Sequence, residues 1–123
     1  MRTLCAVALL AALIGGPAYA DCSFPRPPEK LPDGRTATKE EMLEGQKSVQ
    51  AYNDAINKYV SCLELERTDA LAKAGDQLTP AQKEELDRIA VQKHNAAIDQ
   101  LEAIAGRFNE QVRVFKAKEK DKG

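Results

Sequence analysis

Few residues of this chain have side chains whose type and spacing could support chemistry. The sequence contains one histidine, His94, and three cysteines, Cys5, Cys22 and Cys62. A zinc site needs about four ligands, and no cysteine or second histidine lies at ligand spacing on the helical face of His94. The serines lack the partners of a nucleophilic triad, because only a single histidine is present. We therefore expect no enzyme, no metal site and no cofactor.

The charged residues do not suggest an active site or a nucleic-acid surface either. Most carboxylates have a lysine or arginine three or four residues away, as Glu84 has Arg88, which is typical of solvated ion pairs on helices. No glycine-rich phosphate loop occurs. The formal net charge is -1, so the bulk charge does not favour nucleic acid.

The first twenty residues have the pattern of a secretory signal peptide. Arg2 is followed by an apolar run from Leu4 to Ile14 and by the small-x-small motif Ala18-Tyr19-Ala20. The run is shorter than the about 20 residues that span a bilayer, which argues against the alternative of an N-terminal anchor. We predict cleavage after Ala20, no stable membrane insertion afterwards, and a periplasmic or secreted protein.

Cleavage would leave two cysteines, Cys22 and Cys62, which in an exported protein most simply form one disulfide. Residues 21–37 form a proline-rich arm that favours an extended conformation. A helix from Thr38 to Cys62 would measure about 36 Å, and the arm can reach about 50 Å. The arm can therefore double back along the helix.

The arm and the first helix carry a set of motifs. These are Cys22-Ser-Phe-Pro25, Pro28, the turn Pro32-Asp33-Gly34, Glu41-Met42, Gln46, Val49, Tyr52, Tyr59 and Cys62-Leu63. In these motifs the chain resembles a group of small exported proteobacterial proteins of unassigned function. That group shares a signal peptide, a Cys- and Pro-rich start, a Pro-Asp/Asn-Gly turn and a helix with Tyr-x-x-Cys-Leu. The resemblance implies no activity.

Two capping boxes predict where helices begin. Thr38 and Glu41 form the first box, and Thr79 and Gln82 form the second, while Gly75 is a suitable residue to end the first helix. The predicted organisation is a signal peptide at 1–20, an arm at 21–37, a helical hairpin at 38–118 (helix 38–74, loop 75–78, helix 79–116) and a charged, frayed tail at 117–123.

Each predicted helix has an apolar seam with alternating steps of three and four residues. The seams are Met42, Gly45, Val49, Tyr52, Ile56, Tyr59 and Leu63, and Asp87, Ala90, His94, Ala97, Leu101, Ile104, Phe108, Gln111 and Phe115. The short loop predicts an antiparallel hairpin, which places Gly45 opposite Phe108 and Tyr59 within hydrogen-bonding reach of His94. The predicted fold is an all-α, coiled-coil-like hairpin with the arm tied back by the disulfide.

One edge of the hairpin is more apolar than two helices require. Val91, Ile98, Ala105 and Val112 recur every seven residues beside the second seam, and Val60 lies beside the first. The arm, through Phe24 and Leu31, is the preferred cover, with a second hairpin or a partner protein as the alternatives. Val60, Val91, Ile98 and Val112 are thus the candidate partner face.

These features predict an exported, non-enzymatic binding or scaffolding protein of the cell envelope, which acts with a protein partner or as a homodimer. The alternative function is a small-ligand or metal-binding periplasmic protein that uses Tyr59 and His94.

Overall fold

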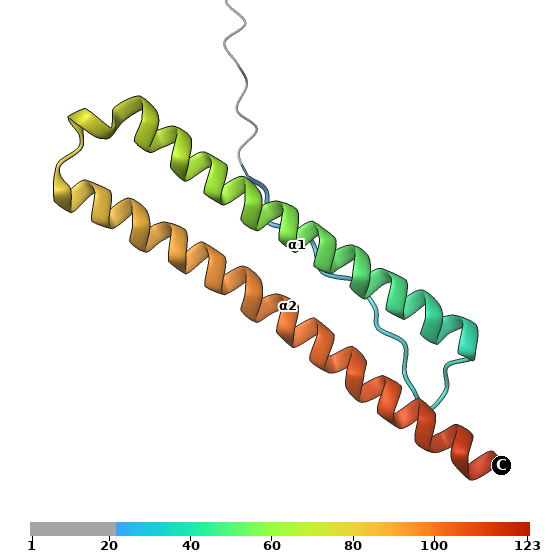
Figure 1. Cartoon of the computed structure of the whole chain (residues 1–123). Coiled ribbons are helices and arrows are strands. Elements are labelled where there is room, and N and C mark those ends of the chain that lie inside the picture. The colour runs from blue at the N-terminus through green and yellow to red at the C-terminus, as the bar shows by residue number, and fades with distance from the viewer. Residues whose placement is uncertain (1–21) are drawn as a thin grey trace, which may run out of the picture.

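A computed structural model describes residues 22–123, and the predicted signal peptide lies outside these residues. Two long helices, α1 (Lys39–Ala74) and α2 (Pro80–Lys122), lie antiparallel, and the short helix η1 (Gly75–Gln77) lies between them. The extended arm runs alongside the pair and returns to the start of α1 (Figure 1). No strand occurs within the described residues. The predicted all-α hairpin is confirmed.

Both predicted capping boxes are present. At the start of α1, the Thr38 hydroxyl accepts a hydrogen bond from the backbone N–H of Glu41, and the Glu41 carboxylate accepts one from Thr38 N–H at 2.7 Å. Thr79 and Gln82 make the same pair of bonds before α2, with Pro80 in the first turn. Each box satisfies two N–H groups that have no partner within the helix.

The end of α1 differs from the prediction. Gly75 has right-handed helical dihedrals, φ -56° and ψ -39°, and not the left-handed conformation of a glycine that terminates a helix. The chain instead tightens into η1, where Leu78 N–H donates to Gly75 O at 3.4 Å as well as to Ala74 O at 3.1 Å. Tightening of the last turn satisfies helix carbonyls without a left-handed residue. Part of the predicted loop is therefore helical.

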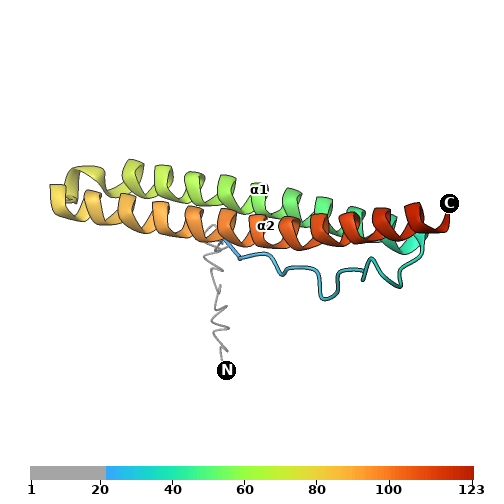
Figure 2. The same ribbon diagram turned by 90° about the horizontal axis from the view of Figure 1, so that it is seen from below.

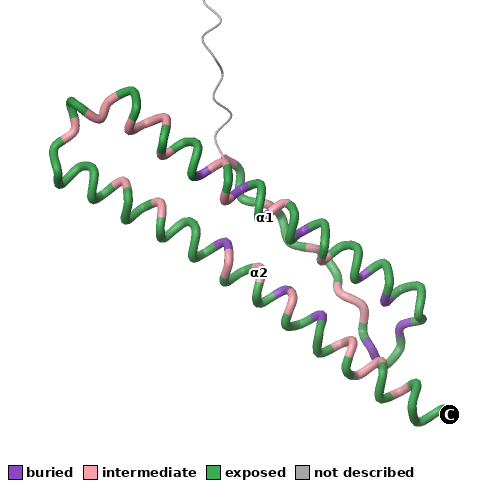
Figure 3. The backbone as a smooth tube through the Cα atoms, viewed as in Figure 1, coloured by how far each residue is buried: buried purple, intermediate pink, exposed green. Residues whose placement is uncertain are grey.

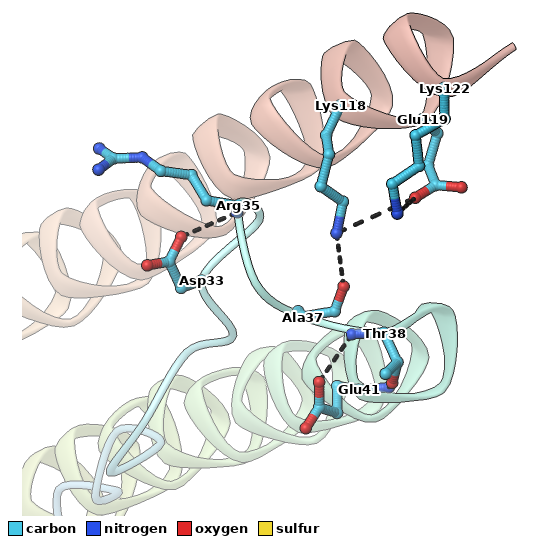
Figure 4. Close-up of polar contacts among 8 residues, drawn as sticks. All are labelled: Asp33, Arg35, Ala37, Thr38, Glu41, Lys118, Glu119 and Lys122. Carbon is cyan, nitrogen blue, oxygen red and sulfur yellow. Dashed lines mark hydrogen bonds and ion pairs between the residues drawn. The ribbon is translucent and has the colours of Figure 1, made fainter.

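The predicted end of the second helix at residue 116 and the frayed tail at 117–123 are wrong, because α2 continues to Lys122. Lys118 Nζ donates to the carbonyl of Ala37 at 2.8 Å and lies 4.8 Å from the centre of the Phe115 ring. Figure 4 shows how this lysine joins the last turns of α2 to the segment that precedes α1. Lysines also suit the negative end of the helix macrodipole.

The core occupies only part of the length of the hairpin. One cluster centres on Tyr52, Ile56, Tyr59, Leu63, Ala97 and Ile104, and a second one contains Ala37, Met42 and Phe108. None of the residues from 64 to 96 is buried, and Figure 3 shows the buried residues on the half of the hairpin away from the loop. We call residues 64–96 the loop half and the remaining part of the two helices the arm half.

Candidate functional site

The predicted disulfide between Cys22 and Cys62 is present, with the two Cα atoms 5.7 Å apart. It fixes the beginning of the arm to the middle of α1. From this point the arm runs toward the open end of the hairpin, as its predicted reach requires.

The other end of the arm is held against α2 by the predicted turn. Gly34 N–H donates to Gln111 Oε1 at 2.8 Å, and Ala37 N–H donates to Asp33 O at 2.8 Å. A Cβ atom at Gly34 would collide with the backbone of Gln111 and would lie 2.8 Å from Phe115 N. Glycine is therefore required here because two backbones approach closely, and no positive φ is involved. The sequence predicts the turn but not this contact.

The arm covers one face of the hairpin only. Its residues line grooves with Ser48 and Ala55 of α1 and with Arg107 and Val114 of α2. Each of these four residues immediately precedes a seam residue, so all four lie on the same side of the seam. Figure 2 shows the arm on a single side of the two helices. We call this side the arm face.

The prediction that the arm covers the apolar edge is wrong. Phe24 packs edge-on against Tyr59, with ring centroids 5.2 Å apart, and Leu31 packs against the cluster around Phe108. Both arm residues therefore contact seam residues, and they do so from the side of the arm face. A signal for this placement exists in the sequence, because Cys62 itself precedes the seam residue Leu63, and an arm bonded to Cys62 must begin on that side.

The predicted partner residues lie on the opposite side of the seam. We call this side the open face, and it consists of the residues that come immediately after a seam residue in the sequence. Val60, Ile98 and Val112 are half-buried because they pack against the core clusters, whereas Val91 is 56% exposed. The fold thus brings the four residues to one face, and no described segment covers it.

The structure does not bring Tyr59 and His94 together as predicted. Tyr59 is buried against Phe24, whereas His94 is exposed, and its Nδ1 lies 3.3 Å from Oδ1 of Asn95. The predicted Tyr59–His94 hydrogen bond is wrong, since Tyr59 is already packed against the arm. Within residues 22–123, no group of three or more histidine, cysteine or acidic side chains could hold a metal ion. The two residues therefore form no joint ligand site.

Two further polar groups show how the halves of the hairpin differ. The Tyr52 hydroxyl is buried without a hydrogen-bond partner among the described residues, and burial raises the pKa of this side chain. In the loop half, the exposed carboxylate of Asp87 accepts a hydrogen bond from Arg67 Nε at 2.7 Å, and this bond raises the pKa of Arg67. Asp87, predicted in the seam, instead forms a surface ion pair across the two helices.

Comparison of the chain with family models, with curated proteins and with solved structures found no match. Neither long helix of the described part has a stretch apolar enough to cross a membrane.

Proposed function

We propose that this chain is an exported, non-enzymatic protein of the cell envelope that acts by binding or scaffolding. The observation that carries the proposal is the open face, on which Val60, Val91, Ile98 and Val112 lie together and no described segment covers them. An apolar column with a fixed heptad spacing suits packing against another helical surface.

Two features support the envelope as the compartment. The Cys22–Cys62 bond is of a kind that persists in oxidising compartments and is rare in the cytosol. The predicted signal peptide at residues 1–20 would deliver the chain there. The resemblance to small exported proteobacterial proteins points in the same direction and stays a prediction.

The rigidity of the hairpin supports a scaffolding role. The arm is bonded to α1 at Cys62 and hydrogen-bonded to α2 through Gln111 and Lys118. It therefore links the two helices on one face, which holds the other face in a fixed shape. A preformed surface binds with a smaller entropy cost than a flexible one.

Site-specific photo-crosslinking in the native envelope tests the proposal. A photoreactive residue at Val91 on the open face should join the chain to a defined protein, which includes a second copy of this chain. The same residue at Gln92, which is also exposed but lies on the outer side of α2, is the matched control. No adduct at position 91, or equal adducts at both positions, would contradict a binding role for the open face.

A further inference from the structure

The open face differs from the rest of the surface in its charge. On α1, from Leu43 to Val60, it consists of Leu43, Gln46, Gln50, Asn53, Asn57 and Val60 and has no charged residue. On α2, from Val91 to Val112, the apolar column alternates with Asn95, Glu102 and Asn109. Charged residues make up 30% of the whole chain, yet Glu102 is the only one within these two stretches, and the charged residues Glu64, Arg88 and Lys116 lie beyond their ends.

This composition is typical of a surface that packs against protein. Interface cores are depleted of charged side chains. Asparagine and glutamine side chains both donate and accept hydrogen bonds, so a row of amides is complementary to a copy of itself. A charged row would repel its own copy, and this one would not. The pattern therefore suits a second copy better than a highly charged partner.

We propose that two copies of this chain pack open face against open face and form an antiparallel four-helix bundle, with the two arms on the outside. This inference rests on the proposed binding function and names its partner. Leu43 and Val91, which are 47% and 56% exposed, would then be covered at the two ends of the contact.

The area of the face is sufficient. The stretch of α2 from Val91 to Val112 is about 33 Å long, and two adjacent helices are about 20 Å wide. The flat footprint is therefore about 660 Å² per copy, which is close to the about 800 Å² that each partner contributes to an interface of standard size.

The position of Glu102 selects one orientation of the two copies. If the twofold axis lay in the plane of the contact and perpendicular to the helices, α2 would pack on α2 of the second copy. The two Glu102 carboxylates would then meet near the centre. If the axis runs parallel to the helices, α1 packs on α2 of the second copy instead. Glu102 then faces Gln50 and Asn53, whose amides can donate to it, and Leu43 faces Val112. The parallel axis avoids the repulsion of like charges.

Light scattering on the oxidised mature protein tests the dimer. We expect twice the chain mass at micromolar concentration and dissociation on dilution. Asn53→Glu places a charge at the centre of the contact and should raise the dimer dissociation constant at least about tenfold. Ser61→Glu places the same charge on the outer side of α1 and should leave the constant unchanged. Circular dichroism confirms that both variants keep the helical fold.

The outcomes separate this inference from the proposed function. A monomeric parent protein overturns the dimer, and a dimer that Asn53→Glu leaves intact overturns the contact through the open face. If the parent is monomeric while position 91 still crosslinks to another protein, the binding function stands and only the second copy is excluded.

Mixed isotopic labelling tests the orientation. A photoreactive residue at position 43 should yield adducts between light and heavy copies, with the attachment points on α2 near residue 112. Attachment to α1 of the other copy would overturn the parallel axis.

Discussion

The arm half and the loop half are built from the same two helices, yet only the arm half has a core. Ile56 is fully buried there, whereas Ile89 in the loop half is 36% exposed. Across the loop half the contact between the helices is made by half-buried residues such as Ala70, Leu86 and Ala90 and by the exposed ion pair of Arg67 with Asp87.

The difference teaches that two helices alone do not exclude water from this seam. A helix pair covers its seam from two directions only, and the remaining two faces stay wet unless a third segment is added. In the arm half the arm supplies that segment through Leu31 and Ala37, which pack against the cluster around Phe108. Capping and helix propensity hold both halves helical, but burial depends on the arm.

Removal of the disulfide should have the largest effect on the difference in burial between the arm half and the loop half. In the double variant Cys22→Ser/Cys62→Ser, the free energy of unfolding should fall by about 4 kcal/mol, because a loop of about 40 residues is no longer closed in the unfolded chain. Denaturant unfolding measures the loss, and hydrogen exchange should show it in the arm half. A loss below about 1 kcal/mol would mean that the hydrogen bonds at Gly34 and Lys118 hold the arm without the bond.

The same isoleucine truncation in each half compares the two halves directly. Ile56→Ala should lower the free energy of unfolding by about 2–5 kcal/mol, because it leaves a cavity among well-packed side chains. Ile89→Ala should cost less, about 1–2 kcal/mol, since Ile89 is 36% exposed and leaves no enclosed cavity. Equal losses in denaturant unfolding would show that the loop half is packed as well as the arm half.

A methyl group added to a glycine probes how tightly the arm is seated. At Gly45 a Cβ atom would lie 2.6 Å from Pro32 Cδ and 3.0 Å from Phe108 Cε2, whereas at Gly75 it would meet nothing within 4 Å. Gly45→Ala should therefore lower the free energy of unfolding by about 1–3 kcal/mol. Gly75→Ala should raise it by about 0.4–1 kcal/mol. If Gly45→Ala proves as stable as the parent, the arm is not seated on the seam.

The smallest effect concerns the Tyr52 hydroxyl, whose burial without a partner reflects the dry core of the arm half. Tyr52→Phe should raise the free energy of unfolding by about 1 kcal/mol at neutral pH. The pKa of Tyr52 is raised above its ordinary value of 10.0, so the unfolded chain releases this proton first, and stability should fall as the pH rises above that value. The variant should lack this alkaline loss.

Tyr59→Phe, in the same seam but against the arm residue Phe24, is the control for the alkaline unfolding curve. Tyr59→Phe should not show the gain in the free energy of unfolding that is expected from Tyr52→Phe. A Tyr52→Phe variant less stable than the parent would show that the hydroxyl has a hydrogen-bond partner and that water enters the core.

Much of the fold could be predicted because it depends on local signals. Thr38 and Thr79 occupy N-cap positions that few other residues suit, and the opposition of Gly45 and Phe108 follows from the heptad spacing once the loop is short. The disulfide was predicted because only two cysteines would remain after the predicted cleavage. These inferences use the neighbours of a residue, a count of cysteines, the heptad spacing and the reach of the arm, all of which can be read from the sequence.

The errors concern contacts between segments distant in sequence. His94 and Asp87 fit the heptad spacing but are exposed. Tyr59, which was predicted to face His94, packs against Phe24 instead, and Asp87 pairs with Arg67 at the surface.

The tail contains good helix formers such as Ala117, Lys118 and Glu119, whereas the hydrogen bond from Lys118 to Ala37 is a contact that no local pattern in 117–123 indicates. The arm covers the face on which Cys62 lies. The position of Cys62 beside the seam therefore predicts the covered face, whereas the apolar edge does not.

The contacts of the arm also impose an order of events on the nascent chain. Cys22 emerges first, but its partner Cys62 follows only after another 40 residues, and Gln111 and Lys118, which hold the turn, emerge later still. Synthesis proceeds from the N-terminus, so the arm can pair with α1 early but cannot close onto α2 until nearly the whole chain is available. Until then the apolar seam of α1 is exposed to solvent and accessible to a chaperone or a second chain.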